Sequence, residues 1–157
     1  MPKRPPKPEP AFTLRPGESI TFVLPVVPRT KKNHREHIKR RAKSGKLITV
    51  PIPGGAYREM EALIKKEASL AMVRLERWVA VAWLNLAQAL NCAAIFYRDA
   101  NRGDANGYYQ GLADALEAAG VLADDKWIVQ WDGSRLRKDK DRPRIEVTLT
   151  AVSDGKR

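Results

Sequence analysis

Apolar and polar residues alternate in several short stretches of this chain, which is the two-residue period of a half-buried β-strand. Residues 19–24 and 144–150 alternate cleanly, and residues 46–50 are rich in β-branched side chains. Residues 90–97 form a nearly continuous apolar run that is typical of a central strand. A fifth strand is predicted at residues 127–131. These stretches predict a sheet of about five strands.

Two other stretches follow the 3.6-residue period of an amphipathic helix. The first predicts a helix of about 20 residues, with one apolar face made by Tyr57, Met60, Ile64, Ala68, Ala71 and Leu75. The second predicts a helix that ends before Gly120, a residue suited to a left-handed C-terminal cap. Its apolar face is made by Tyr108, Leu112, Ala115, Leu116 and Ala119, and its polar side by Asn106, Gln110 and Asp114.

The order of these elements, β-β-α-β-α-β-β, predicts an α+β fold with a small mixed sheet and two packed helices. At 157 residues the chain is expected to form one domain. Residues 1–17 are basic and rich in proline, so we expect a disordered tail followed by a single domain over residues 18–152. The basic stretches 29–46 and 135–140 are interpreted as loops.

Residues 78–97 carry no charged side chain, and a run of about 20 apolar residues can span a bilayer. Asn85, Gln88 and Asn91 interrupt the run, and a buried amide without a partner is costly in hydrocarbon. We therefore favour an apolar segment at 78–86 followed by the strand at 90–97, with no membrane partner. The N-terminus lacks the apolar region of a secretory signal, and the single cysteine, Cys92, is expected to be a buried thiol.

The net charge of the chain indicates more about its binding partners than its overall composition does. The net charge of +11 and a pI near 10 indicate a polyanionic partner, for which nucleic acid is favoured over an anionic membrane surface. Basic side chains crowd residues 29–46, and like charges this close indicate that an anion meets them. The residues expected to contact DNA phosphates are Arg29, Lys31, Lys32, Arg35, Lys39, Arg40, Arg41 and, further along the chain, Lys126.

Carboxylates frame the second predicted helix, with Asp104 before it and Asp124 and Asp125 after it. Each has an ordinary explanation, because an aspartate before a helix is commonly an N-cap and two after it form a solvated turn. The alternative is a site for Mg²⁺, which prefers oxygen ligands and can activate water beside a phosphodiester. For Trp127 and Trp131, packing in an apolar strand is favoured over stacking on unpaired bases.

The spacing of these residues resembles the RusA family of Holliday-junction resolvases. The similarity covers about residues 19–150 and rests on the pattern Asp104-x9-Asp114-Ala115-Leu116-x3-Gly120-x3-Asp124-Asp125, on Arg29-Thr30-Lys31-Lys32-Asn33 and on Tyr57-Arg58. The resemblance implies a Mg²⁺-dependent endonuclease, active as a homodimer on four-way DNA junctions in a bacterial or phage-derived cytoplasmic setting. It implies that Asp104 and Asp125 bind the metal and carry the cleavage chemistry, with Asp124 and Asn106 as further ligands.

Two positions depart from the family pattern, since Asn106 replaces an aspartate and Gln110 replaces a lysine that Lys126 is a candidate to supply. An alternative function is therefore a non-catalytic DNA-binding module on the same scaffold. A helix of about 15 residues is about 22 Å long, which separates Asp104 from Asp125. We expect the two to meet only if residues 98–107 fold back along the helix or if a partner subunit supplies one of them.

Overall fold

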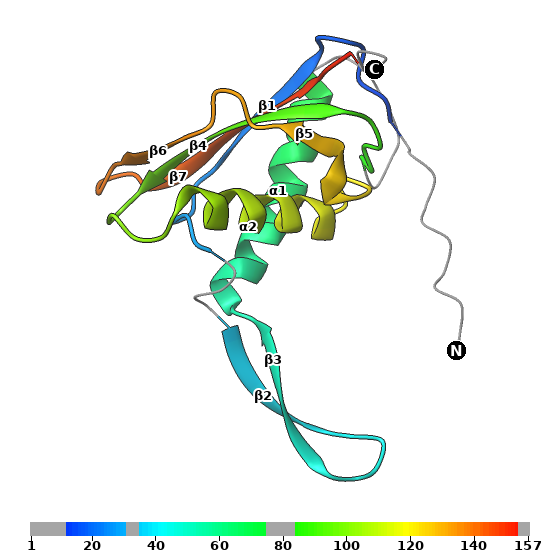
Figure 1. Cartoon of the computed structure of the whole chain (residues 1–157), viewed down its shortest axis with the longest axis vertical. Coiled ribbons are helices and arrows are strands. Elements are labelled where there is room, and N and C mark those ends of the chain that lie inside the picture. Colours follow the sequence, from blue (N-terminus) through cyan, green and yellow to red (C-terminus); the bar gives the residue numbers. More distant parts are fainter. Residues whose placement is uncertain (1–11, 31–34, 75–83, 154–157) are drawn as a thin grey trace.

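The computed structural model describes residues 12–30, 35–74 and 84–153. Within these residues the chain forms two α-helices, a short 3₁₀ helix and seven strands (Figure 1). In chain order the elements are β1 (Ser19–Leu24), β2 (Arg35–Arg41), β3 (Leu47–Pro53), α1 (Gly55–Arg74), β4 (Leu90–Arg98), α2 (Ala105–Ala118), η2 (Asp125–Trp127), β5 (Ile128–Gln130), β6 (Arg135–Lys138) and β7 (Arg144–Ala151).

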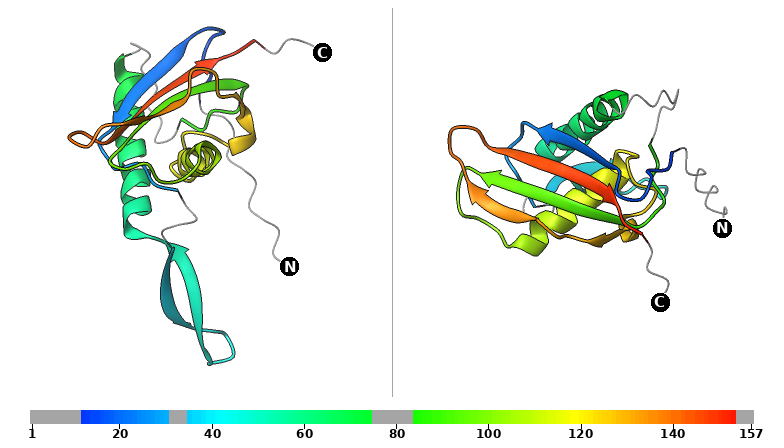
Figure 2. Two further views of the ribbon diagram at one scale, coloured as in Figure 1. Left: turned by 60° about the vertical axis from the view of Figure 1, so that its left-hand side comes forward. Right: turned by 90° about the horizontal axis from the view of Figure 1, so that it is seen from above.

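The main sheet has five strands, and β4 lies at its centre. Its order is β1-β7-β4-β5, and β6 pairs with the same edge of β4 as β5 does. The contacts of β7 with β1 and with β4 are antiparallel, whereas β5 and β6 run parallel to β4. Both helices cover one face of this sheet (Figure 2). The predicted α+β class, with a small mixed sheet and two helices, is confirmed.

The core forms between this face of the sheet and the two helices. Every second residue of β4 is buried from Leu90 to Phe96, and the same alternation runs along β7 from Ile145 to Ala151. The predicted apolar faces of both helices are buried as far as they are described. The Tyr57 hydroxyl of α1 donates to the Gly111 carbonyl of α2 at 3.1 Å, and burial, followed by the charge of Asp114, raises the pKa of Tyr57. The helices are thereby held against each other.

Both basic stretches that we interpreted as loops contain strands, and that interpretation is wrong. Residues 35–41 form β2, which pairs with β3 in a separate two-stranded sheet, and residues 135–138 form β6 on the edge of β4. Long basic side chains are compatible with a strand when both of its faces lie near solvent, because the backbone supplies the pairing. The stretch 127–131 begins as the helical turn η2 and only then becomes the short β5.

The packed part of the chain begins earlier than the expected boundary at residue 18. Phe12 and Leu14 lie in the core, 6% and 1% exposed. The amide side chain of Gln88 donates to the Leu14 carbonyl at 2.9 Å and accepts from the Leu14 N–H at 2.8 Å. These bonds replace strand pairing for Leu14, so residues 12–14 pack even though Pro16 follows them. Residues 1–11, most of the expected tail, lie outside the described residues.

The apolar stretch that raised the question of a membrane span enters the core at its second half. Residues 78–83 lie outside the described part, whereas Leu86, Leu90 and Cys92 are fully buried. The backbone N–H groups of Asn85 and Leu86 donate to the carbonyls of Gly120 and Val121 at 2.8 Å each. In the described ranges, no helix combines the length and apolar character needed to cross a membrane.

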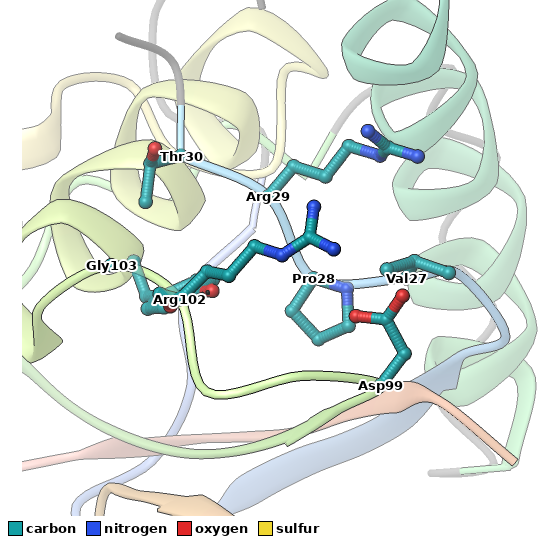
Figure 3. A pocket seen from close by; sticks show the side chains of 8 residues that line it. Val27, Pro28, Arg29, Thr30, Asp99, Arg102 and Gly103 are labelled. Carbon is teal, nitrogen blue, oxygen red and sulfur yellow. Dashed lines mark hydrogen bonds between the residues drawn. The ribbon is translucent and has the colours of Figure 1, made fainter. Parts of the chain in front are cut away.

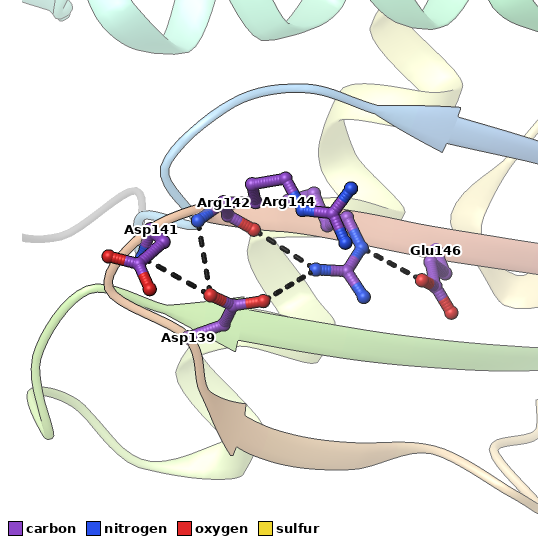
Figure 4. Close-up of polar contacts among 5 residues, drawn as sticks. All are labelled: Asp139, Asp141, Arg142, Arg144 and Glu146. Carbon is purple, nitrogen blue, oxygen red and sulfur yellow. Dashed lines mark hydrogen bonds and ion pairs between the residues drawn. The ribbon is translucent and has the colours of Figure 1, made fainter.

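The connection from β6 to β7 is fastened by one carboxylate (Figure 4). Asp139 accepts hydrogen bonds from the N–H groups of Arg142 and Asp141. It also forms an ion pair with the Arg144 guanidinium at 2.9 Å. These bonds, the one from the Arg142 N–H first, lower the pKa of Asp139. Arg144 also pairs with Glu146 and lies 3.6 Å from the centre of the Tyr97 ring on β4. This connection is a structural brace.

Candidate functional site

The N-terminal end of α2 is capped by Asp104. Its backbone is extended and its Oδ1 accepts a hydrogen bond from the Gly107 N–H at 2.7 Å. The N-cap interpretation of Asp104 is therefore confirmed. Asp104 is exposed, and an ionised carboxylate has about four lone-pair sites, so capping leaves it able to bind a second partner.

Thr30 packs against this end of α2, where the basic stretch of the chain begins. A Cβ on Gly107 would lie 2.8 Å from the Asp104 Oδ1 and 3.1 Å from the Thr30 Cγ2, so a larger residue would displace the capping carboxylate. Gly103 has a φ of +74°, and a Cβ at this position would lie 3.3 Å from the same Thr30 methyl group (Figure 3). Thr30 is thus held beside Asp104, whereas the predicted DNA-binding residues Lys31 and Lys32 lie outside the described residues.

The C-terminal end of α2 carries a cluster of three acidic side chains, which we call the acidic cluster. One carboxylate oxygen each from Glu117, Asp124 and Asp125 lies within 4.8 Å of the others. Two ligands on opposite sides of one cation are separated by about 4.2 Å for Mg²⁺ and up to about 5.2 Å for Ca²⁺. The acidic cluster therefore has dimensions that could hold a metal ion.

Hydrogen bonds to the backbone set the geometry of the acidic cluster. Asp124 caps η2 by accepting from the Lys126 N–H at 3.2 Å, and Glu117 accepts from the Asp125 N–H at 3.3 Å. Lys126 lies 3.5 Å from the Asp124 carboxylate, but its side chain is 67% exposed, and such a surface pair contributes little. Sequence reasoning missed Glu117. The signal for it was Gly120, because a left-handed residue there turns the chain back past the last turn of α2.

The chain after α2 does fold back. Gly120 has a φ of +75°, and the N–H groups of Val121 and Leu122 both donate to the Leu116 carbonyl. Asp125 consequently lies beside the middle of α2, where its Oδ2 accepts from the Gln110 Nε2 at 3.2 Å. This reversal comes from residues 120–125, a route that our expectation did not include.

This reversal shortens the separation of the two predicted catalytic residues along the helix. Gln110 lies six residues after Asp104, which corresponds to about 9 Å of helix rise rather than 22 Å. Asn106 is exposed on α2 one turn before Gln110. Asp104 is not a member of the acidic cluster, and one metal ion shared by Asp104 and Asp125 stays a prediction.

The electrostatics of the acidic cluster favour a cation. The C-terminus of a helix carries partial negative charge, and the last turn of α2 contains no basic residue to offset it. Three carboxylates at that position repel one another and the helix terminus. Gln110 supplies two neutral hydrogen bonds, one to Asp125 and one of 2.8 Å to the Asp114 Oδ1. These bonds orient both carboxylates without neutralising them.

The predicted DNA-binding residues of the basic stretch lie mainly on the hairpin of β2 and β3, which we call the basic arm. The arm projects beyond the start of α1, away from the main sheet (Figures 1 and 2). Lys39, Arg40 and Arg41 are exposed on it. Its register gives it two faces, because Ile38 pairs with Val50 and Arg40 with Ile48, whereas Lys39 pairs with Thr49 on the other side. The Arg35 side chain lies outside the described part.

Two aromatic residues near α2, Tyr109 and Trp131, belong to the packing of the protein. Trp131 is stacked on Tyr109 with ring centroids 4.8 Å apart and planes 9° apart, and both pack against the core. The packing interpretation of Trp131 is confirmed. Cys92 is buried as expected, and burial raises the pKa of its thiol, so the thiol stays protonated. Its role is structural.

The structure thus divides the predicted site residues among three places. Asp124, Asp125 and Lys126 lie on the segment that turns back beside α2, Asp104 and Arg29 lie near the N-terminal end of α2, and Lys39, Arg40 and Arg41 lie on the basic arm. Neither the known protein-family models nor the curated proteins that we compared with the chain match it. The residues and their arrangement are therefore the basis on which a function is inferred.

Proposed function

We propose that this protein is a Mg²⁺-dependent, structure-selective endodeoxyribonuclease that cuts branched DNA such as four-way junctions. The observation that carries the proposal is the acidic cluster of Glu117, Asp124 and Asp125 at the negative end of α2. It lies in a chain with a net charge of +11. Carboxylates repel DNA phosphates, and a bound divalent cation converts that repulsion into attraction.

A magnesium ion at this position supplies the chemistry of phosphodiester hydrolysis. It can activate a water molecule for attack and neutralise the charge that develops on the phosphate. In the proposed assignment Asp125 and Asp124 hold the ion together with Glu117. Asp104 and Asn106, at the N-terminal end of α2, are the further proposed ligands. Asp104 and Asp125 keep the catalytic roles that the RusA resemblance implies.

The basic arm supplies affinity for DNA in this proposal. Lys and Arg side chains that neutralise phosphates release counterions, and such contacts hold a duplex without reading its sequence. The major groove of B-DNA admits a two-stranded β-ribbon, and the arm has that form. A homodimer would present two arms and two acidic clusters, matching the two strands that must be cut in a four-way junction.

A second function, a non-catalytic DNA-binding module, is favoured by one contact. The amide of Gln110 bonds Asp125 and Asp114 directly, so a neutral side chain occupies the position where the resemblance calls for a lysine. The amide satisfies part of both carboxylates without any ion. The basic arm would serve this function equally well.

Nicking of a synthetic four-way junction distinguishes the two functions. We expect nicked product with Mg²⁺ and none with EDTA, and none from Asp125→Asn at any Mg²⁺ concentration. Asp132→Asn is the matched control, because Asp132 is exposed and only its backbone has a described hydrogen bond. Tight junction binding without Mg²⁺-dependent nicking by the wild-type protein would instead establish the binding module.

A further inference from the structure

The basic arm stands apart from the rest of the protein. Its two strands, β2 and β3, pair with each other along their whole length. Among the described residues, neither strand packs broadly on the main sheet or on a helix (Figures 1 and 2). A two-stranded hairpin on its own is only marginally stable in water. The arm is therefore expected to gain stability when a partner lies against it.

The register of the basic arm decides which side chains share a face. Residues that are directly opposite each other lie on the same face of a hairpin, as do their neighbours two positions along. Leu47 is opposite Arg41, and Thr49 is opposite Lys39. One face of the arm, which we call the cationic face, therefore carries Lys39 and Arg41 together with Leu47 at its far end.

Leu47 is the most exposed large apolar side chain in the described part of the chain. It is 62% exposed, compared with 42% for Ile38 and 41% for Ile48 on the opposite face of the arm. Leu47 belongs to the last strand pair before the turn, which is closed by a 2.8 Å hydrogen bond from the Ala42 N–H to the Lys46 carbonyl. An apolar side chain thus stands near the tip of the arm, on its cationic face.

Charge indicates which partner this tip fits. Residues 35–53 carry six lysine and arginine side chains and one glutamate. A second copy of the arm would bring the same excess of positive charge, which opposes contact between two arms. A DNA strand brings phosphates that Lys39 and Arg41 can neutralise, and it brings apolar base surfaces that Leu47 can cover. The combination of charge and exposure therefore favours DNA over a second copy.

We propose that Leu47 is a wedge that inserts between bases at the branch point of a DNA junction. This role rests on the proposed function and names the residue through which the protein prefers branched DNA to a linear duplex. Leucine is among the side chains that proteins insert between base steps, and the insertion costs the stacking of that step. The cost is lowest where bases are already unpaired. Pairing and stacking are interrupted at a branch point, so the wedge stabilises a complex with branched DNA more than one with a duplex.

The test uses a four-way junction that carries 2-aminopurine next to the branch point, because this base fluoresces more strongly when it is unstacked. Protein is titrated in EDTA, so no strand is cut. We expect a saturable rise in fluorescence with the wild-type protein and little rise with Leu47→Ala. The affinity of Leu47→Ala for the junction should fall by about tenfold, the loss expected for most of a buried leucine side chain. Its affinity for a linear duplex should change little, since Lys39 and Arg41 remain.

Two further variants make the result specific. Leu47→Met keeps an apolar side chain of similar volume and should restore the rise in fluorescence. Leu70→Ala makes the same deletion at an exposed position of α1 and should behave as the wild type does. Equal losses in Leu70→Ala and Leu47→Ala, or an undiminished rise in Leu47→Ala, would overturn the wedge.

Sedimentation of the DNA-free protein tests the rival partner. If Leu47→Ala weakens self-association and leaves the fluorescence rise intact, Leu47 lies between two copies of the chain and the wedge is wrong. Near-UV circular dichroism of each variant establishes that it is folded.

The outcome is separable from that of the endonuclease proposal. The fluorescence titration needs neither Mg²⁺ nor cleavage, so a protein that unstacks the branch point through Leu47 but never nicks the junction keeps the wedge and loses the nuclease. A protein that nicks junctions equally well, and unstacks them equally, with leucine or alanine at position 47 keeps the nuclease and loses the wedge. A protein that binds no junction loses both.

Discussion

The two ends of α2 carry the same kind of side chain with opposite physical consequences. At the N-terminus the Asp104 carboxylate meets a backbone N–H and the positive end of the helix dipole, so its charge is stabilised by the helix itself. At the C-terminus Glu117, Asp124 and Asp125 meet one another and the negative end of the dipole. The carboxylate charge at the N-terminal end is stabilised without a ligand. The carboxylate charges at the C-terminal end would be stabilised further by a bound cation.

This difference shows how to read acidic residues around a helix. A carboxylate at the N-terminus has a sufficient structural reason to be there, so any metal role for Asp104 adds to its role as a cap. At the C-terminus Asp124 and Glu117 each accept one backbone N–H, from Lys126 and Asp125, but α2 itself offers the three carboxylates only the negative end of its dipole. The acidic cluster is therefore the stronger evidence for metal binding, although the sequence directs attention first to Asp104.

The largest effect that we expect is the loss of nicking in Asp104→Asn and Asp125→Asn. Each substitution removes one negative charge from the proposed metal site, and it also removes repulsion toward phosphates, so junction binding should stay equal or become stronger. Asparagine caps a helix about as well as aspartate does, so Asp104→Asn separates the metal role from the cap.

Nicking and junction affinity are both measured for these variants, with Asp132→Asn as the control. If Asp104→Asn nicks at the wild-type rate while Asp125→Asn is inactive, the N-terminal end of α2 is a cap only. Equal loss of junction binding in both variants would make both residues structural.

The next largest effect concerns the basic arm, whose positive charge contrasts with both ends of α2. Replacing Lys39, Arg40 and Arg41 by glutamine should weaken junction binding and reduce the slope of log K against log salt by about 0.9 for each lost phosphate contact. Affinity is measured at several salt concentrations. The matched control is a triple glutamine variant of Arg58, Lys65 and Lys66 on α1, and an unchanged slope in the arm variant would show that the arm does not touch DNA.

A smaller effect tests the acidic cluster by stability alone. A ligand that binds only the folded state at ten times its Kd adds about 1.4 kcal/mol to the free energy of unfolding, so Mg²⁺ should raise the Tm of the wild-type protein. Glu117→Gln should reduce this increase and, without Mg²⁺, should raise the Tm slightly because it relieves repulsion. Glu59→Gln on the exposed side of α1 is the control, and an unaltered response to Mg²⁺ in Glu117→Gln would exclude Glu117 as a ligand.

The smallest effect that we expect concerns the N-terminal end of α2, where Asp104 is the cap. Asp104→Ala removes the cap and should lower the free energy of unfolding by about 1 kcal/mol, whereas Asp104→Asn should change it little. Denaturant unfolding in EDTA measures both variants without any contribution from metal. A loss as large in Asp104→Asn as in Asp104→Ala would mean that charge, and not the hydrogen bond to Gly107, stabilises this end of α2.

The sequence by itself determined the elements whose burial pattern is local. The strands at 19–24, 90–97 and 144–150 and both helices could be predicted, because one apolar face must be buried and the period of that face identifies the element. The capping Asp104 and the left-handed Gly120 were also readable, because helix ends impose local conformational demands. The α+β class followed from the order of these elements.

Only the tertiary structure decided where distant residues meet. Arg135–Lys138 becomes a strand because an edge of β4 is open to it, and Leu14 enters the core because the Gln88 amide satisfies its backbone. Glu117 joins Asp124 and Asp125 because the chain reverses at Gly120. Local periodicity carries no information about such partners, since pairing and convergence depend on the path of the whole chain.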